Sequence, residues 1–209
     1  MDPHRNYNSL GRHYRPGEDF VVLLRETDSR LTVMAPHGGG IEPGTVDIAD
    51  AIAGNDFTFY AFKGIMKSGN RALHLDSNCF DEPTGLAAAE KAEVVLTIHG
   101  CRDEKPVVLI GGRQTVLMET IRKSLIQSGF QAEISTRPGL RGSDPQNICN
   151  RFTSNGGVQL ELAYGLRQRL FFHLENRSRR GKTTLFFSFV DAVRQPLLKK
   201  LSKPREARQ

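Results

Sequence analysis

Two histidines and a glutamate follow apolar runs of this chain at positions that suit a metal site. His37 ends the first run, in LTVMAPHGGG (31–40), and Glu42 follows five positions later. His99 ends a second run, VVLTIHG (94–100). Two imidazole nitrogens and one carboxylate, with a fourth position left to water, are the ligands of a catalytic zinc site. If the runs are neighbouring strands, the three side chains meet, and the glycines allow the loop to fold tightly enough for Glu42 to reach the metal.

A hydrolytic zinc site also needs a general base, and the run VQLEL (158–162) offers one. Such a base takes a proton from water and passes it to the leaving group. In an extended strand, Glu161 points to the opposite side from the apolar residues of this run. A carboxylate in the interior of a sheet is unfavourable without a partner or a task, so Glu161 is the candidate base. The alternative is an edge strand that leaves Glu161 in solvent.

Other chemistry around these residues stays open. Each histidine alone also fits a hydrogen-bonded structural residue. Cys101, two residues past His99, fits a nucleophile with His99 as its base, a metal ligand, or a small buried thiol. The glycine runs match neither the phosphate-binding nor the dinucleotide-binding spacing.

The elements that must position these residues alternate along the chain. Apolar runs rich in β-branched residues predict eight strands, at 20–24, 31–35, 57–62, 72–76, 94–100, 107–112, 132–135 and 158–162. Helical patterns occupy 44–54, 81–92, 113–129 and 185–201. This order predicts one α/β domain with a central mixed sheet and helices on both faces. Such sheets bind ligands at the loops that leave their strands, where both histidines fall.

Length and composition are those of one domain with an anionic partner. The chain has 209 residues, of which 38% are hydrophobic, and we divide it into an extension (1–18), a hydrolase domain (19–201) and a basic tail (202–209). The net charge of +6 favours nucleic acid, a membrane surface or a polycarboxylate substrate. Three cysteines without a CxxC pair do not suit a disulfide framework.

Targeting signals are not apparent in the sequence. The N-terminal region has no apolar core of a signal peptide. No stretch approaches the roughly 20 apolar residues that span a bilayer. We therefore expect a cytoplasmic protein without a membrane partner, with release by lysis as a further option.

Several motifs together resemble the poly-γ-glutamate hydrolase family of bacteriophages and bacterial genomes, whose members are often labelled phage-related replication proteins. APHGGGIEPGT, TIHGC, NICNRF and GGVQLELAYGLR stand in the family's order, and the resemblance spans residues 19 to 195. It implies a zinc-carboxypeptidase-like fold and cleavage of the γ-glutamyl amide bonds of poly-γ-glutamic acid. Position by position, it implies zinc ligands on His37, Glu42 and His99 and the catalytic glutamate on Glu161.

The implied substrate carries a free carboxylate on every residue, which calls for cationic contacts. Arg151, helped by Asn150, is the first choice, because an Asn-Arg pair holds a substrate carboxylate in zinc carboxypeptidases. Arg167 and Arg113 are second choices, and each also fits an ordinary surface arginine.

The chain departs from the family pattern at two places, and other functions remain as alternatives. Cys79 stands where a histidine is common, and NRF replaces NRG at 150–152. His74 fits either a site residue or a structural histidine. One alternative is a zinc amidohydrolase acting on another acyl-amino acid or peptide. The other is a basic nucleic-acid-binding protein of the phage replication type, although no known reader motif is apparent. The oligomeric state stays open.

Overall fold

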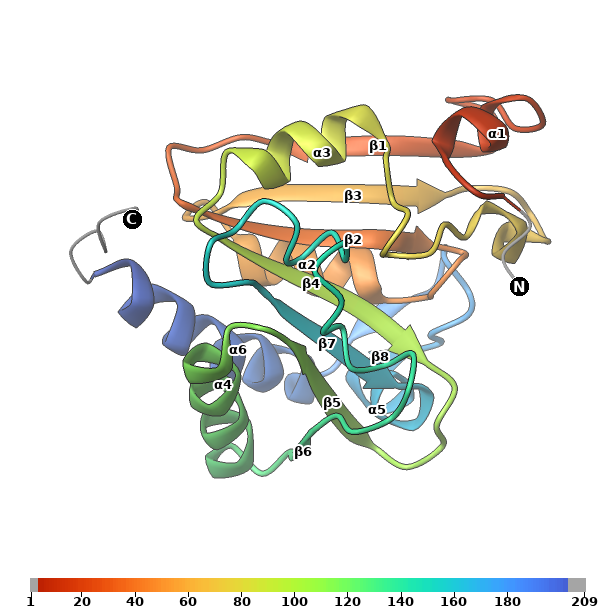
Figure 1. Ribbon diagram of the computed structural model, residues 1–209. Coiled ribbons are helices and arrows are strands. Elements are labelled where there is room, and N and C mark those ends of the chain that lie inside the picture. The colour runs from red at the N-terminus through yellow and green to blue at the C-terminus, as the bar shows by residue number, and fades with distance from the viewer. Residues whose placement is uncertain (1–3, 203–209) are drawn as a thin grey trace.

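The computed structural model describes residues 4–202, which form one α/β domain around a mixed sheet of seven strands (Figure 1). The strands are β1 (Phe20–Arg25), β2 (Leu31–Gly39), β3 (Thr58–Gly64), β4 (Val94–Cys101), β5 (Val107–Gly112), β6 (Gln131–Ile134) and β7 (Val158–Ala163). Their order is β1-β3-β2-β4-β7-β5-β6. β3, β2, β4 and β7 run parallel, β1 and β5 are antiparallel to their neighbours β3 and β7, and β6 is parallel to β5. The predicted mixed sheet is therefore confirmed.

Helices cover both faces of the sheet, as predicted. They are α1 (Tyr7–Gly11), α2 (Thr45–Ala53), α3 (Pro83–Glu90), α4 (Thr115–Gln127), α5 (Tyr164–Leu170) and α6 (Thr184–Leu201). α2, α4, α5 and α6 pack on one face, and α1 and α3 pack on the other. In Figure 1, α3 and the long loop 135–157 lie in front of the sheet, and α2 and α6 lie behind it. No helix within residues 4–202 is both long and apolar enough to cross a bilayer.

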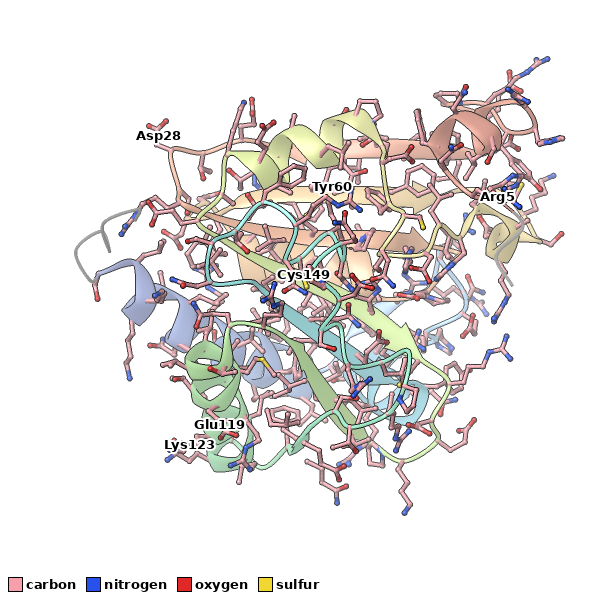
Figure 2. All side chains as sticks on the ribbon, viewed as in Figure 1. Arg5, Asp28, Tyr60, Glu119, Lys123 and Cys149 are labelled. Atoms are coloured by element: carbon pink, nitrogen blue, oxygen red, sulfur yellow. The ribbon has the colours of Figure 1, made fainter. Side chains whose placement is uncertain are left out.

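The apolar runs become strands because the sheet is covered on both sides. Every residue of β2 is buried, and the same holds for every residue of β7. A strand buried on both faces reads as a continuous apolar run, which makes β2 easy to recognise. Figure 2 shows charged side chains such as Glu119 and Lys123 on the outer side of α4, away from its buried stripe of Leu117, Ile121 and Leu125.

A crevice forms at the carboxyl ends of β2 and β4. The two strands are paired only as far as Met34 and Thr97. On its other side, β2 shifts register against β3 between Ala35 and Gly38, so one extra residue stands on β2 there. Pro36 lies in this bulge, where its missing N–H is tolerated. β2 then leads to β3 through α2 on one face, whereas β3 reaches β4 through α3 on the other. Such a divergence of connections produces a ligand-binding crevice in open α/β sheets.

One predicted strand is wrong. Residues 72–76 do not join the sheet: Asn70–Leu73 form a short 3-10 helix, and the chain continues as a loop. Leu73 and Leu75 are both buried, so the alternation that suggested a strand is real, but it comes from packing across one face of the sheet. Because this segment is outside the sheet, the carbonyl of Leu75 is available to a side chain.

Some elements were not predicted. α1 and α5 are short, and β8 (Phe171–Phe172) and β9 (Gly181–Lys182) pair only with each other. Within the predicted extension, Leu10 is fully buried in the apolar cluster beneath α3. The predicted basic tail, apart from Ser202, lies outside the described residues.

Candidate metal centre and active site

The crevice between β2 and β4 brings His37, Glu42 and His99 together. One possible ligand atom from each lies within 4.8 Å of the others, and this is the group with metal-binding geometry found among residues 4–202. The Nδ1 atoms of the two histidines are 3.1 Å apart. His37 Nδ1 is 3.3 Å from Glu42 Oε1, and His99 Nδ1 is 3.9 Å from Glu42 Oε2. Both histidines are 2% exposed, so the donor atoms face each other instead of bulk water.

The orientation of these groups and the low pKa values of His99 and Glu42 suit a metal ion. His37 Nε2 lies 2.6 Å from Leu75 O and donates to it, so Nδ1 is the ring nitrogen that faces the cluster. Burial, followed by the charge of His37, lowers the pKa of His99 to about 3. Burial by itself raises the pKa of Glu42, but His37, His99 and the Gly100 N–H outweigh it and the net pKa is lowered. A metal would be bound by the imidazoles in their neutral form and by the ionised carboxylate of Glu42.

The loop after β2 folds tightly to return Glu42 to His37. The Glu42 N–H donates to His37 O at 2.9 Å, and its carboxylate accepts from Gly100 N–H at 2.7 Å. Gly39 has a φ of +69°, and a Cβ there would overlap Gly64 O. Glycine is therefore required at this position. This geometry agrees with the prediction that the glycines let Glu42 approach His37.

Glu161 lies beside the cluster on a central strand. β7 pairs with β4 and β5, and Glu161 stands opposite His99 in the β4 register. Its side chain is 6% exposed, so the solvent-facing edge-strand alternative is wrong. Burial, and then the charge of Glu42, raises the pKa of Glu161 well above its usual value. A cation held by the neighbouring ligands would oppose this shift, because it favours the ionised carboxylate.

A cavity of about 920 Å³ opens over these four residues. Five arginines line it: Arg71, Arg102, Arg137, Arg141 and Arg167. Four further carboxylates also line it: Asp76, Asp103, Asp144 and Glu175. The wall is therefore mixed in charge, and the arginines act as separate contacts instead of a uniformly positive surface. Of the five, only Arg167 was named from the sequence.

Arg71, Arg102 and Arg141 differ from the other two arginines of the cavity. Arg137 is ion-paired with Asp103. Arg71, Arg102 and Arg141 are exposed, and their side chains have no hydrogen bond or ion pair within the described part of the chain. Arg71 lies in the short 3-10 helix, and Arg102 and Arg141 lie in two loops, so the three come from segments far apart in sequence. Arg102 could have been identified from the sequence, because it follows His99 by three residues, directly after the end of the same strand.

Arg167 has a different environment. It is 4% exposed, and its guanidinium donates to Leu162 O, Pro43 O and Cys101 O at 3.2, 2.8 and 3.0 Å. These carbonyls belong to β7, to the loop that carries Glu42, and to the end of β4. Arg167 therefore ties together the three segments that carry Glu161, Glu42 and His99.

We expect Arg167→Met to lower the free energy of unfolding by roughly 3 kcal/mol, because three carbonyls lose a charged donor in a buried place. Denaturant unfolding measures this loss. Arg169→Met is the matched control: Arg169 lies on the same helix but is exposed, and its replacement should change stability by less than about 0.5 kcal/mol. Equal stability of the two variants would contradict the bridging role.

The remaining arginine candidates lie away from the cavity wall. Arg151 donates to Gln146 O, Phe80 O and Asn78 O. Asn150 donates to Gly142 O and Asp144 O and accepts from Gly157 N–H. Neither these two residues nor Arg113 belongs to the cavity lining found among residues 4–202. The structure thus brings Arg167 to the ligand cluster and leaves Asn150, Arg151 and Arg113 outside it.

Two further residues lie near the centre. The rings of His74 and His37 are 3.8 Å apart between centroids, and His74 Nε2 is 4.0 Å from Glu42 Oε1. Cys101 also lines the cavity, but burial raises the pKa of its thiol, which disfavours a thiolate nucleophile at neutral pH. Cys79 is exposed and outside the lining.

These features define an α/β protein with a histidine and glutamate cluster at the carboxyl edge of its sheet. The chain belongs to the poly-γ-glutamate hydrolase family, whose sequence model matches residues 4–192. The family is one of hydrolases.

Known relatives agree over nearly the whole chain. A bacteriophage poly-γ-glutamate hydrolase structure is 29% identical, covers 97% of this chain and 99% of its own, and superposes with a TM-score of 0.91. A zinc-free structure of YndL is 31% identical, with coverages of 96% and 99% and a TM-score of 0.88. YmaC of Bacillus subtilis (strain 168) is 30% identical over 204 residues, which are 96% of this chain and 86% of YmaC.

Proposed function

We propose that this protein is a zinc-dependent hydrolase that cleaves the γ-glutamyl amide bonds of poly-γ-glutamate. The observation that carries the proposal is the convergence of His37, Glu42 and His99 beside a buried Glu161, at the base of an open cavity. The name of the bacteriophage relative, a poly-γ-glutamate hydrolase, supports the substrate, and the zinc-free state recorded for YndL supports the metal.

The three ligands fit zinc by their chemistry. Two neutral imidazoles and one carboxylate are a known catalytic set that leaves a coordination position open. The hydrogen bond from His37 to Leu75 O holds one imidazole in the orientation that a ligand needs. When bound, zinc supplies Lewis-acid polarisation of the amide carbonyl and a water molecule of lowered pKa.

Glu161 serves as the general base and then as the acid. It accepts a proton from the attacking water and donates it to the departing amide nitrogen. Its Oε1 accepts from Gln159 Nε2 at 2.9 Å, and no other side-chain hydrogen bond of Glu161 is found among residues 4–202. Burial raises its pKa and a cation at the neighbouring ligands would oppose that shift, which suits a group that accepts the proton and holds it between the two steps.

The substrate contacts come from the loops around the cavity. Every residue of a γ-linked glutamate chain carries a free α-carboxylate, and guanidinium groups match carboxylates in geometry. Arg71, Arg102 and Arg141 line the cavity without an ion-pair partner in the described part of the chain. We assign these three to the carboxylates of the polymer, in preference to Arg151 and Asn150, whose side chains already donate to backbone carbonyl oxygens.

We expect Arg141→Gln to raise KM for the polymer by about tenfold with a much smaller change in kcat, because a charged hydrogen bond to bound substrate is lost. Initial rates across polymer concentrations measure this change. Arg5→Gln is the control, since Arg5 is exposed (Figure 2) and does not belong to the cavity lining. An unchanged KM in the Arg141 variant would remove this residue from the substrate site.

The proposal is tested by following polymer length. The purified protein is incubated with poly-γ-glutamate, with α-linked polyglutamate and with a small acyl-glutamate, each with and without a chelator. We expect shortening of the γ-linked polymer alone, loss of that activity on chelation, and recovery with added zinc. Hydrolysis of only the small substrate would favour the amidohydrolase alternative. If the zinc-loaded protein left the polymer unchanged, the assignment of poly-γ-glutamate as substrate would be overturned.

A further inference from the structure

Two buried amide side chains lie directly behind Glu161. Gln159 is 3% exposed and comes from the same strand, and Asn147 is 4% exposed and comes from the loop that covers β4 and β7. Gln159 Nε2 donates to Glu161 Oε1 at 2.9 Å, and Asn147 Nδ2 donates to Gln159 Oε1 at 2.9 Å. The N–H of Cys149, labelled near the middle of the molecule in Figure 2, donates to Asn147 Oδ1 at 3.1 Å.

The direction of this chain of hydrogen bonds is fixed at both ends. A backbone N–H only donates, so the Asn147 side chain must turn its oxygen to Cys149 and its NH₂ to Gln159. Gln159 must then accept with its oxygen, which turns its own NH₂ toward Glu161. Glu161 Oε1 is the acceptor of that NH₂, so the last bond has the required polarity as well. A side-chain amide assigned from such a network is determined by its partners.

Buried amides on the wall of a cavity are unfavourable unless they are satisfied. Both Asn147 and Gln159 line the cavity over the candidate metal centre. A leucine or methionine at position 159 would fill the same space without a polar group to satisfy. Gln159 instead donates its NH₂ to the carboxylate that we assign as the base. The hydrogen bond of this side chain, more than its packing, therefore points to a role in the site.

We infer that Gln159 is a positioning residue, which holds Glu161 Oε1 so that the other carboxylate oxygen is presented to the reacting water, and that Asn147 sets the direction of the Gln159 amide. The inference rests on the proposed role of Glu161. It adds Gln159 and Asn147 to the active site as residues that act through Glu161 and not through contact with substrate.

Kinetics of paired variants test this inference. We expect Gln159→Met to lower kcat about tenfold or more with KM nearly unchanged, because loss of a positioning hydrogen bond affects the reaction more than binding. Asn147→Ala should lower kcat by a smaller factor, since Gln159 remains but is free to turn. Gln114→Met is the control, a buried glutamine outside the cavity lining. Zinc content and Tm show whether each variant is folded.

The decisive comparison uses a variant that already lacks the base. In a Glu161→Gln background, Gln159→Met should cause little further loss, since both substitutions remove the same function. The same tenfold loss in both backgrounds would show that Gln159 acts through something other than Glu161, and would overturn the inference. Wild-type kcat in the Gln159→Met enzyme would also overturn it.

A spectroscopic measurement keeps the inference separate from the substrate assignment. The side-chain NH₂ resonances of Gln159 in ¹⁵N-labelled protein are those absent from the Gln159→Met spectrum. We expect them to shift when Glu161 is replaced by glutamine, whereas resonances unchanged by that replacement would contradict the hydrogen bond. A wild-type protein that leaves poly-γ-glutamate intact would refute the proposed function, but the Gln159 resonances would still show whether this side chain holds Glu161.

Discussion

A Glu161→Gln variant will bind zinc with normal stoichiometry and lose turnover of the γ-linked polymer by about 10²-fold or more, the range attributed to general acid–base catalysis. Glutamine has nearly the same shape as glutamate, so β7 and its neighbours should keep their packing. It offers no basic oxygen at neutral pH, so the attacking water keeps its proton. The metal ligands, His37, Glu42 and His99, are untouched.

The measurement combines metal analysis, thermal unfolding and kcat on the same protein sample. Glu133→Gln is the matched control, because Glu133 also lies in a strand but is exposed at the edge of the sheet on β6. It should retain wild-type turnover. Near wild-type turnover in the Glu161 variant would mean that another group moves the proton, and His74, which lines the same cavity, would be the next to examine.

The sequence predicted the sheet well because most of its strands are buried on both faces. β2 and β4 appear as largely apolar runs and β7 as an alternation of apolar and polar residues, and their parallel arrangement places His37, His99 and Glu161 at one edge. The incorrect strand prediction at 72–76 also comes from the burial pattern. Alternating burial of Leu73 and Leu75 indicates one covered face, but it does not reveal whether a backbone ladder is present.

The cavity wall was harder to predict than its base. The topology of the sheet fixes the positions of strand ends. Arg71, Arg102 and Arg141 instead stand on a 3-10 turn and two loops, whose approach to one another depends on tertiary packing. The Asn-Arg pair at 150 and 151 showed the opposite problem. Its residue types suit carboxylate binding, but nearby carbonyl oxygens already accept hydrogen bonds from both side chains. A sequence motif does not show which acceptors its hydrogen-bond donors contact in the folded protein.

The amide chain behind Glu161 was also hidden in the sequence. Gln159 is visible in VQLEL as a polar residue that shares a face with Glu161. Its partner Asn147 comes from a loop with no regular pattern, and the direction of the hydrogen bonds depends on the backbone N–H of Cys149. Long-range polar pairing of this kind leaves no periodic signal.

Removal of a ligand should have the other large effect: His37→Ala is expected to lose zinc and activity together. His37 provides one of three donor atoms, and its hydrogen bond to Leu75 O holds the ring toward Glu42. Loss of an outer hydrogen-bond partner of a ligand typically weakens metal binding by 10–100-fold, so loss of the ligand itself should weaken it by about 10²-fold or more.

The discriminating comparison is His74→Ala. The His74 ring lies against His37, but its Nε2 is 4.0 Å from Glu42 Oε1 and it is outside the group with metal-binding geometry. We therefore expect this variant to keep about one zinc per chain, measured after dialysis against a metal-free buffer, while His37→Ala keeps little. Zinc added in excess should restore part of the activity of the His37 variant if only affinity was lost. Equal retention of zinc by both variants would place the metal elsewhere, since a site built on His37 requires its Nδ1 lone pair.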